Sequence, residues 1–132
     1  MATQYRFSFG PWNLHEGADP FGPTVRPSRE FVEKLDLAVK LGFQGIQFHD
    51  DDVIPADLPA PQMEKAVAEV KKLLDDRGLV AEFIAPRLWE DPRTVDGPVT
   101  SNSAAERQYA LDRSKRAIDI ARMIGTKDIV WW

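Results

Sequence analysis

Residues 45–55 read Gly45-Ile46-Gln47-Phe48-His49-Asp50-Asp51-Asp52-Val53-Ile54-Pro55. Gly45, Ile46 and Phe48 indicate a strand, and a histidine and three aspartates follow it directly. Barrels and open sheets of the α/β class build their active sites where strands end in such residues. We therefore predict a site at the end of this strand. The alternative is an acidic turn after a buried strand, in which the aspartates cap the segment that follows.

One pattern recurs around this segment: an amphipathic helix, a glycine, a short turn and an apolar strand. The glycines are Gly42, Gly78 and Gly125, and the predicted strands cover residues 6–10, 45–49, 79–84 and 128–132. Ser28 is the predicted N-cap of the first helix, and Ser103 opens the third with a capping box. Strands that alternate with helices predict parallel pairing through right-handed crossovers, with the strand order following the chain.

The loops that lead from a strand to a helix are long, whereas the turns from a helix to a strand are short. Loops of the first kind carry the active sites of barrel and doubly wound enzymes. Trp12, His49, Trp89 and Trp132 all fall on this side of the predicted sheet. Tryptophan usually fills a core, but it also forms walls for ligands with apolar faces, such as sugars.

His49 and Asp52 lie three residues apart at the junction of strand and loop. A carboxylate that accepts from one imidazole nitrogen fixes the tautomer and aims the other nitrogen at a substrate, so the pair could transfer a proton to a sugar oxygen. The alternative is a histidine that ends its strand beside an exposed aspartate. Asp50 and Asp51 could bind a metal, but Mg²⁺ usually needs carboxylates from several strands, so we assign no metal ligand. Glu82 either faces the interior as a site carboxylate or forms an ion pair in the core.

The composition is that of an ordinary globular domain, with 132 residues, 43% hydrophobic and 29% charged residues and a formal charge of −4. No basic block is present, so we expect no nucleic-acid partner. The absence of cysteine excludes disulfides and thiolate metal sites. No apolar run is long enough to span a bilayer, and the N-terminus lacks a signal-peptide core, so we expect a cytoplasmic protein without a membrane partner.

Three motifs resemble the N-terminal part of xylose isomerase, in its shorter, actinobacterial form. They are Phe7-Ser8-Phe9-Gly10-Pro11-Trp12, Asp19-Pro20-Phe21-Gly22 and residues 48–55. The resemblance continues to Val130-Trp131-Trp132 and covers nearly the whole chain. It implies an α/β fold that is the N-terminal half of a TIM (β/α)8 barrel, with four parallel strands and three helices. Residues 1–132 would then form a single incomplete barrel domain.

The resemblance also implies a function. Xylose isomerases convert D-xylose to D-xylulose by a hydride shift that depends on two divalent cations, such as Mg²⁺, Mn²⁺ or Co²⁺. His49 resembles the histidine that assists ring opening of the aldose, and Asp52 resembles the carboxylate that orients it. Trp12 and Trp132 resemble tryptophans that wall the sugar, and Phe21 resembles a phenylalanine that reaches a neighbouring subunit's site. Trp89 stands at a wall position that relatives fill with phenylalanine.

The chain also departs from the family's pattern. Residues 85–89 read Ala85-Pro86-Arg87-Leu88-Trp89, where relatives carry a threonine-rich strand end, so the preferred sugar is open. The metal ligands and the catalytic lysine of relatives lie beyond the point matched by Trp132. We therefore expect this chain to bind no cation fully and to be inactive alone. Two alternatives are a sugar epimerase or other metal-dependent TIM-barrel enzyme, and a half-barrel assembly module without enzymatic activity.

A half barrel leaves two strand edges unpaired, and unpaired edges are templates for another chain. We expect Ile46, Phe48, Ile84 and Val130 on the open inner face of the sheet, which would make that face apolar. Self-association into a homo-oligomer is the predicted consequence.

Overall fold

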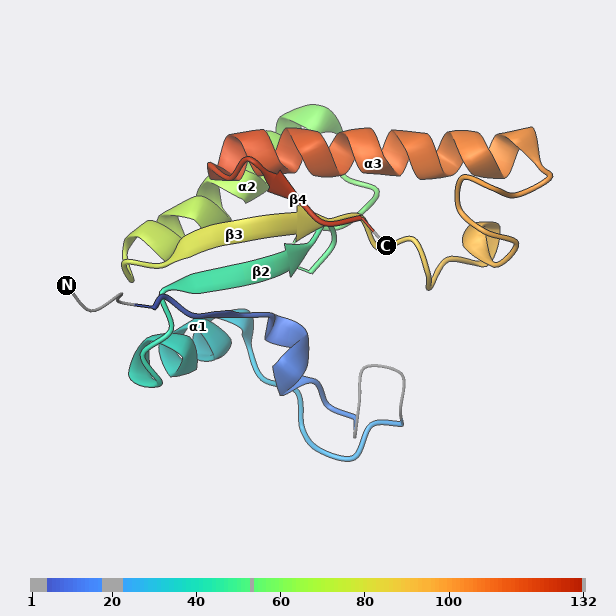
Figure 1. Cartoon of the computed structure of the whole chain (residues 1–132). Coiled ribbons are helices and arrows are strands. Elements are labelled where there is room, and N and C mark those ends of the chain that lie inside the picture. The colour runs from blue at the N-terminus through green and yellow to red at the C-terminus, as the bar shows by residue number, and fades with distance from the viewer. Residues whose placement is uncertain (1–4, 18–22, 53, 132) are drawn as a thin grey trace.

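The computed structural model describes residues 5–17, 23–52 and 54–131 (Figure 1). One parallel sheet has the order β1-β2-β3-β4, so the predicted strand order and direction are confirmed. The strands are β1 (Ser8–Phe9), β2 (Gly45–His49), β3 (Val80–Ala85) and β4 (Asp128–Ile129). The α-helices are α1 (Phe31–Lys40), α2 (Ala60–Asp75) and α3 (Ala104–Ile124), and two 3-10 helices are η1 (Pro11–Leu14) and η2 (Pro92–Thr94).

The two outer strands are shorter than predicted, at two residues each instead of residues 6–10 and 128–132. Each has a neighbour on one side only, so fewer of its backbone groups are fixed by a ladder. The central strand β2 pairs on both sides and has the predicted bounds.

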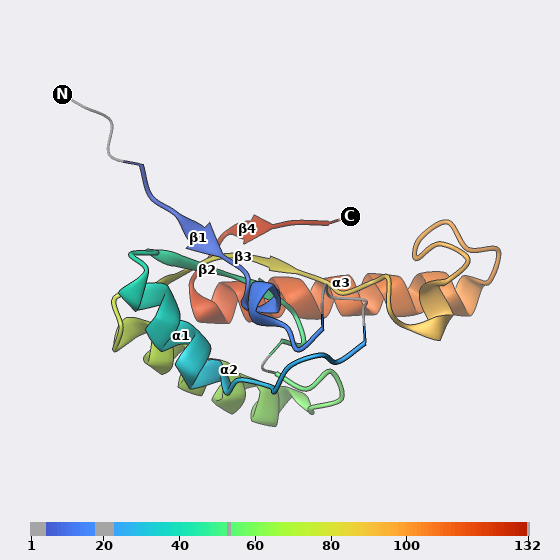
Figure 2. The same ribbon diagram turned by 90° about the horizontal axis from the view of Figure 1, so that it is seen from below.

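The three helices lie on one side of the sheet and leave the other side bare (Figure 2). The core forms between the helices and the sheet. Ile46, Phe48 and Ile84 are at most 2% exposed and belong to this core, so their predicted place on the open inner face was wrong. In a half barrel the helices can bury only one face of the sheet, and Ile46, Phe48 and Ile84 lie there. Val130 follows β4 and is half-buried.

The helix ends differ in how well they follow the sequence pattern. Gly42, Gly78 and Gly125 have left-handed φ angles of 81°, 66° and 97°, so the predicted glycine caps are confirmed. Ser28 is not the N-cap of α1: Glu30 takes that position, and the Ser28 hydroxyl donates to the Glu16 carboxylate instead.

At α3 the capping box is half formed. The Ser103 hydroxyl accepts from the Glu106 amide at 3.4 Å, as predicted. The Glu106 carboxylate accepts from the Ser101 hydroxyl, two residues before the cap, instead of returning to Ser103. Within the described residues, none of the helices combines the length and the apolar character that a membrane crossing requires.

Candidate functional site

Strand β2 ends at His49, and the chain turns back so that Asp52 folds over the strand end. The Asp52 amide donates to the His49 carbonyl at 3.2 Å, and Asp52 Oδ2 accepts from the His49 amide at 2.7 Å. Asp52 Oδ1 lies 3.2 Å from His49 Nδ1, and the His49 residue is 6% exposed. The structure thus brings together the pair that the three-residue spacing predicted.

Arg87, from the loop after β3, donates to the carboxylate of this pair. Its guanidinium donates to Asp52 Oδ1, to Asp51 Oδ1 at 2.7 Å and to Glu90 at 3.1 Å. Because Asp52 Oδ1 accepts from a cation, it is a carboxylate oxygen, and His49 Nδ1 must carry the proton between them. In the neutral imidazole, a proton on Nδ1 leaves Nε2 as the basic nitrogen of the ring.

Burial raises the pKa of Asp51, but the hydrogen bond and charge of Arg87 and the charge of Arg113 outweigh it. The pKa of this carboxyl therefore lies below its ordinary value of 3.8.

Two tryptophans pack against the imidazole of His49. The Trp12 ring centre lies 4.4 Å from that of His49, and the Trp89 ring meets it edge-on at 5.0 Å. Gly10 makes the first contact possible, because a Cβ there would lie 2.1 Å from the Trp12 indole. Trp12 lies in η1, which begins at Pro11 directly after β1 and has Gly10 as its N-cap. The histidine is therefore set between two aromatic walls from different loops.

Asp50 is wholly buried and anchors the loop to α3. Arg113 donates to both of its carboxylate oxygens, Nε at 3.1 Å to Oδ2, and Arg116 donates to Oδ2 at 3.0 Å. Asp50 Oδ1 also accepts from the Arg87 amide at 2.8 Å. Arg113 and Arg116 were not predicted as site residues, because they lie 63 and 66 residues from Asp50 along the chain. Burial lowers the pKa of Arg113, but its bonds to Asp50 outweigh this and raise it.

These contacts also decide whether the aspartates can hold a metal. Each of the three aspartates, Asp50, Asp51 and Asp52, forms an ion pair with at least one arginine side chain of the same chain. The donor set does not fit a divalent ion, which needs several converging free carboxylates. Among the residues that the structure describes, no three His, Cys, Asp or Glu side chains gather as a metal site would require.

The loop after Trp89 is fastened to α3. Asp91 accepts from the Arg93 amide and guanidinium and from the Tyr109 hydroxyl, and the Arg93 guanidinium lies 3.6 Å from the Tyr109 ring centre. The hydrogen bond from the Arg93 side chain, with the other two, holds the pKa of Asp91 well below its usual range. Ion pairs and ring contacts therefore hold the loop that carries Trp89.

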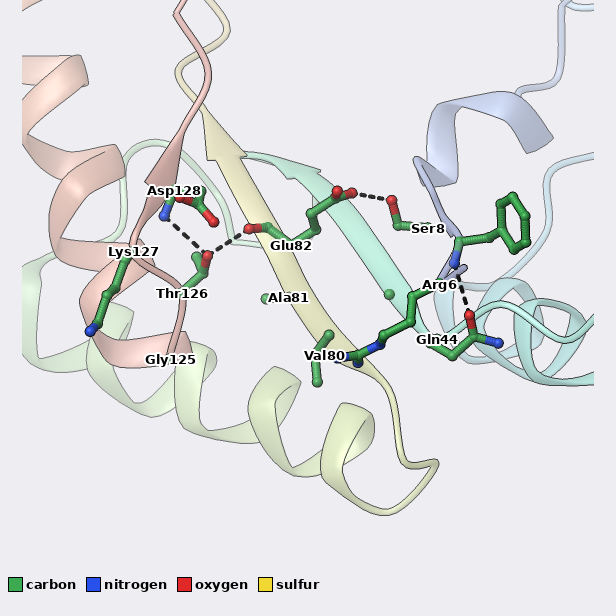
Figure 3. Close-up of a pocket in the computed structure, with 12 residues that line it drawn as sticks. Arg6, Ser8, Gln44, Val80, Ala81, Glu82, Gly125, Thr126, Lys127 and Asp128 are labelled. Atoms are coloured by element: carbon green, nitrogen blue, oxygen red, sulfur yellow. Dashed lines mark hydrogen bonds between the residues drawn. The ribbon is translucent and has the colours of Figure 1, made fainter. Parts of the chain in front are cut away.

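Of the predicted site residues, Trp12, His49, Asp52 and Trp89 meet at one end of the sheet. Phe21 and Trp132 lie outside the described residues. A cavity of about 630 Å³ opens beside the pair and is lined by Trp12, His15, Asp52 and Arg87, among others. A second hollow, of about 460 Å³, lies at the opposite end of the strands (Figure 3). We place the site at the first because Trp12 and Asp52, which both contact His49, line it.

Comparison with known proteins agrees with this architecture. Residues 35–132 match the sequence model of the xylose isomerase-like TIM barrel family. The chain belongs to this family. Its fold is therefore that of a partial TIM barrel, and the predicted fold class is confirmed.

One relative is similar to this chain in sequence, and one solved structure is similar to it in fold. Over 130 residues the chain is 35% identical to the xylose isomerase of Thermus thermophilus, and the match covers 98% of this chain and 34% of that enzyme. The chain thus spans about a third of the length of this relative. The crystal structure of an AP endonuclease, family 2, from Brucella melitensis superposes with a TM-score of 0.56 at 17% identity, covering 94% of this chain and 39% of that one. At that identity the likeness concerns the fold alone.

Proposed function

We propose that the His49 end of the sheet is the sugar-binding and ring-opening part of an aldose–ketose isomerase site of the xylose isomerase type. One observation carries the proposal: the imidazole of His49 is held by Asp52 and packed between Trp12 and Trp89. The identity to the Thermus xylose isomerase extends over this whole region and supports the choice of an aldose such as D-xylose.

In this proposal Asp52 acts through His49. Its carboxylate keeps the proton on Nδ1, so that Nε2 accepts the proton of the anomeric hydroxyl of a bound aldose and passes it to the ring oxygen as the bond between that oxygen and C1 breaks. Arg87 donates to Asp52 Oδ1, the oxygen that also faces His49 Nδ1, and so holds the carboxylate in place. The indole faces of Trp12 and Trp89 pack against the C–H face of the sugar and exclude water from it.

Divalent cations in the family's enzymes polarise the sugar oxygens as Lewis acids. The carboxylates described above are bound to arginines and do not fit such ions, so no step of the proposal runs through them. We accordingly propose that this chain binds an aldose and supports proton exchange at its ring oxygen, but does not by itself complete the isomerisation.

The test follows the imidazole NMR signals of His49, one of the two histidines of the chain. Addition of D-xylose should move these signals. Trp12→Ala should weaken the response several-fold, while Trp131→Ala, at an exposed position, should not. No movement of the His49 signals at the highest sugar concentration would contradict the proposal. Conversion of D-xylose to D-xylulose by the purified chain with Mg²⁺ would contradict the claim of incompleteness.

A further inference from the structure

Side chains of alternating charge connect α3 to the imidazole of His49. Arg113 Nη2 of α3 donates to Asp51 Oδ2 at 2.6 Å, and Asp51 Oδ1 accepts from Arg87 Nε at 2.7 Å. Arg87 also donates to Asp52 Oδ1, which lies 3.2 Å from His49 Nδ1. These four side chains, Arg113, Asp51, Arg87 and Asp52, form a charge row. A cation on α3 is thereby linked to the histidine through direct contacts alone.

The α3 end of the charge row is fixed by burial and by further partners. Arg113 Nε lies 3.1 Å from Asp50 Oδ2, and Arg113 Nη1 donates to the Tyr109 hydroxyl at 3.0 Å. The Arg113 side chain is 9% exposed. Because Nε, Nη1 and Nη2 of this arginine are all bonded, its planar guanidinium has little freedom to move. Asp51 is therefore held from one side by a cation in a fixed place.

Arg87, in the middle of the charge row, is shared between several carboxylates. Its Nε, Nη1 and Nη2 donate to Asp51, Glu90 and Asp52 respectively. A guanidinium presents its donors in a rigid fork, so all its acceptors together decide where it lies. Without Arg113, the charge of Asp51 would act on Arg87 alone. The Arg87 guanidinium would then be drawn toward Asp51 and away from Asp52.

We propose that Arg113 is a positioning residue for His49. By sharing Asp51, it keeps the Arg87 guanidinium beside Asp52 Oδ1. The same oxygen faces His49 Nδ1, so the guanidinium and the imidazole compete for it. A weaker hold of the cation strengthens the hydrogen bond from Nδ1–H to the carboxylate, and that bond sets how readily Nε2 accepts a proton. The consequence for a sugar rests on the function proposed above, whereas the positioning itself acts in the chain without a sugar.

The experiment follows the nitrogen NMR signal of His49 Nδ1 in the purified chain at neutral pH, without sugar. A stronger hydrogen bond from Nδ1–H moves this signal to lower field. Arg87→Gln should therefore move it to lower field, and Arg113→Met should move it the same way by a smaller amount. Arg116→Met is the matched control. Arg116 bonds to Asp50 and to backbone carbonyls but, within the described residues, to no member of the charge row, so its loss should leave the signal near the wild-type position.

Far-UV circular dichroism establishes that each variant is folded. If Arg113→Met is not folded, Arg113→Lys takes its place. The ammonium of that variant is a point charge that cannot bond to Asp50 and Asp51 as the fork of Arg113 does, so the signal should move in the same direction. An unmoved Nδ1 signal in the folded variant, or an equal movement in Arg116→Met, would overturn the proposal.

Addition of D-xylose to the same samples separates this proposal from the proposed function. A wild-type chain that responds to the sugar, while Arg113→Met leaves the Nδ1 signal of His49 unmoved, would refute the positioning role alone. Nδ1 signals that move as expected in variants of a chain that never responds to the sugar would refute the proposed function alone.

Discussion

Replacing Asp50 by asparagine should destabilise the whole domain, because Asp50 is the buried centre of the arginine cluster. Asparagine has nearly the same shape and keeps one acceptor oxygen, so the change removes mainly the charge. The Asp50 side chain is 0% exposed, and those of Arg113 and Arg116 are 9% and 15% exposed. Removing one partner leaves the others as buried, poorly compensated charges.

The cost of breaking a buried ion pair from one side is about 3–5 kcal/mol. We expect the lower end, about 3 kcal/mol, because Arg113 keeps its contact with Asp51 at 2.6 Å. For a chain of this size, that corresponds to a decrease in Tm of roughly 10 °C. Urea unfolding followed by tryptophan fluorescence measures the change directly. Asp119→Asn, on the exposed side of α3, is the control and should change the free energy of unfolding by less than about 0.5 kcal/mol.

An Asp50→Asn chain as stable as the wild type would refute this reasoning, since it would mean that the cluster is solvated. A double-mutant cycle with Arg113→Met sharpens the test. The double variant should be more stable than the sum of the two single changes predicts, because both members of the pair are then neutral.

Three further predictions concern the core, a helix end and the loss of stability at low pH. Phe48→Ala should cost about 3–5 kcal/mol in urea unfolding, because the ring is buried between the sheet and the helices. Gly125→Ala should cost about 1 kcal/mol by the same assay, since φ is 97° and the strain lies in the backbone. The pKa of Asp51 is lowered in the folded chain, so its contribution is present above its unfolded pKa and is lost as the pH falls below about 4. Arg87→Gln should flatten this fall in the urea midpoint between pH 6 and pH 2.5; an unchanged slope would contradict the assignment.

Much of the fold follows from local sequence patterns. Gly42, Gly78 and Gly125 mark the helix ends because only the left-handed conformation lets the chain turn at once into the next strand. The bounds of β2 were predictable because apolar residues run up to a sudden change at His49. The His49–Asp52 contact also follows from local spacing, as it closes a turn of four residues.

What could not be predicted depends on contacts between distant parts of the chain. Arg113 and Arg116 lie 63 and 66 residues from Asp50, so no local pattern pairs them with it. The two faces of the sheet were assigned in reverse, because alternation along a strand shows that Ile46 and Phe48 share a face but not which face the helices cover. Ser28 is not the N-cap because its hydroxyl donates a hydrogen bond to the Glu16 carboxylate in the preceding loop, and Glu30 takes the cap position.

The central claim is that the His49 end of this sheet binds an aldose, and a crystal structure of the chain soaked in D-xylose tests it most directly. The account predicts the sugar against the indoles of Trp12 and Trp89, with its ring oxygen within hydrogen-bond distance of His49 Nε2 and Asp52 still bound to Nδ1. Ordered sugar in the hollow beside Glu82, with the His49 end filled by water alone, would contradict it.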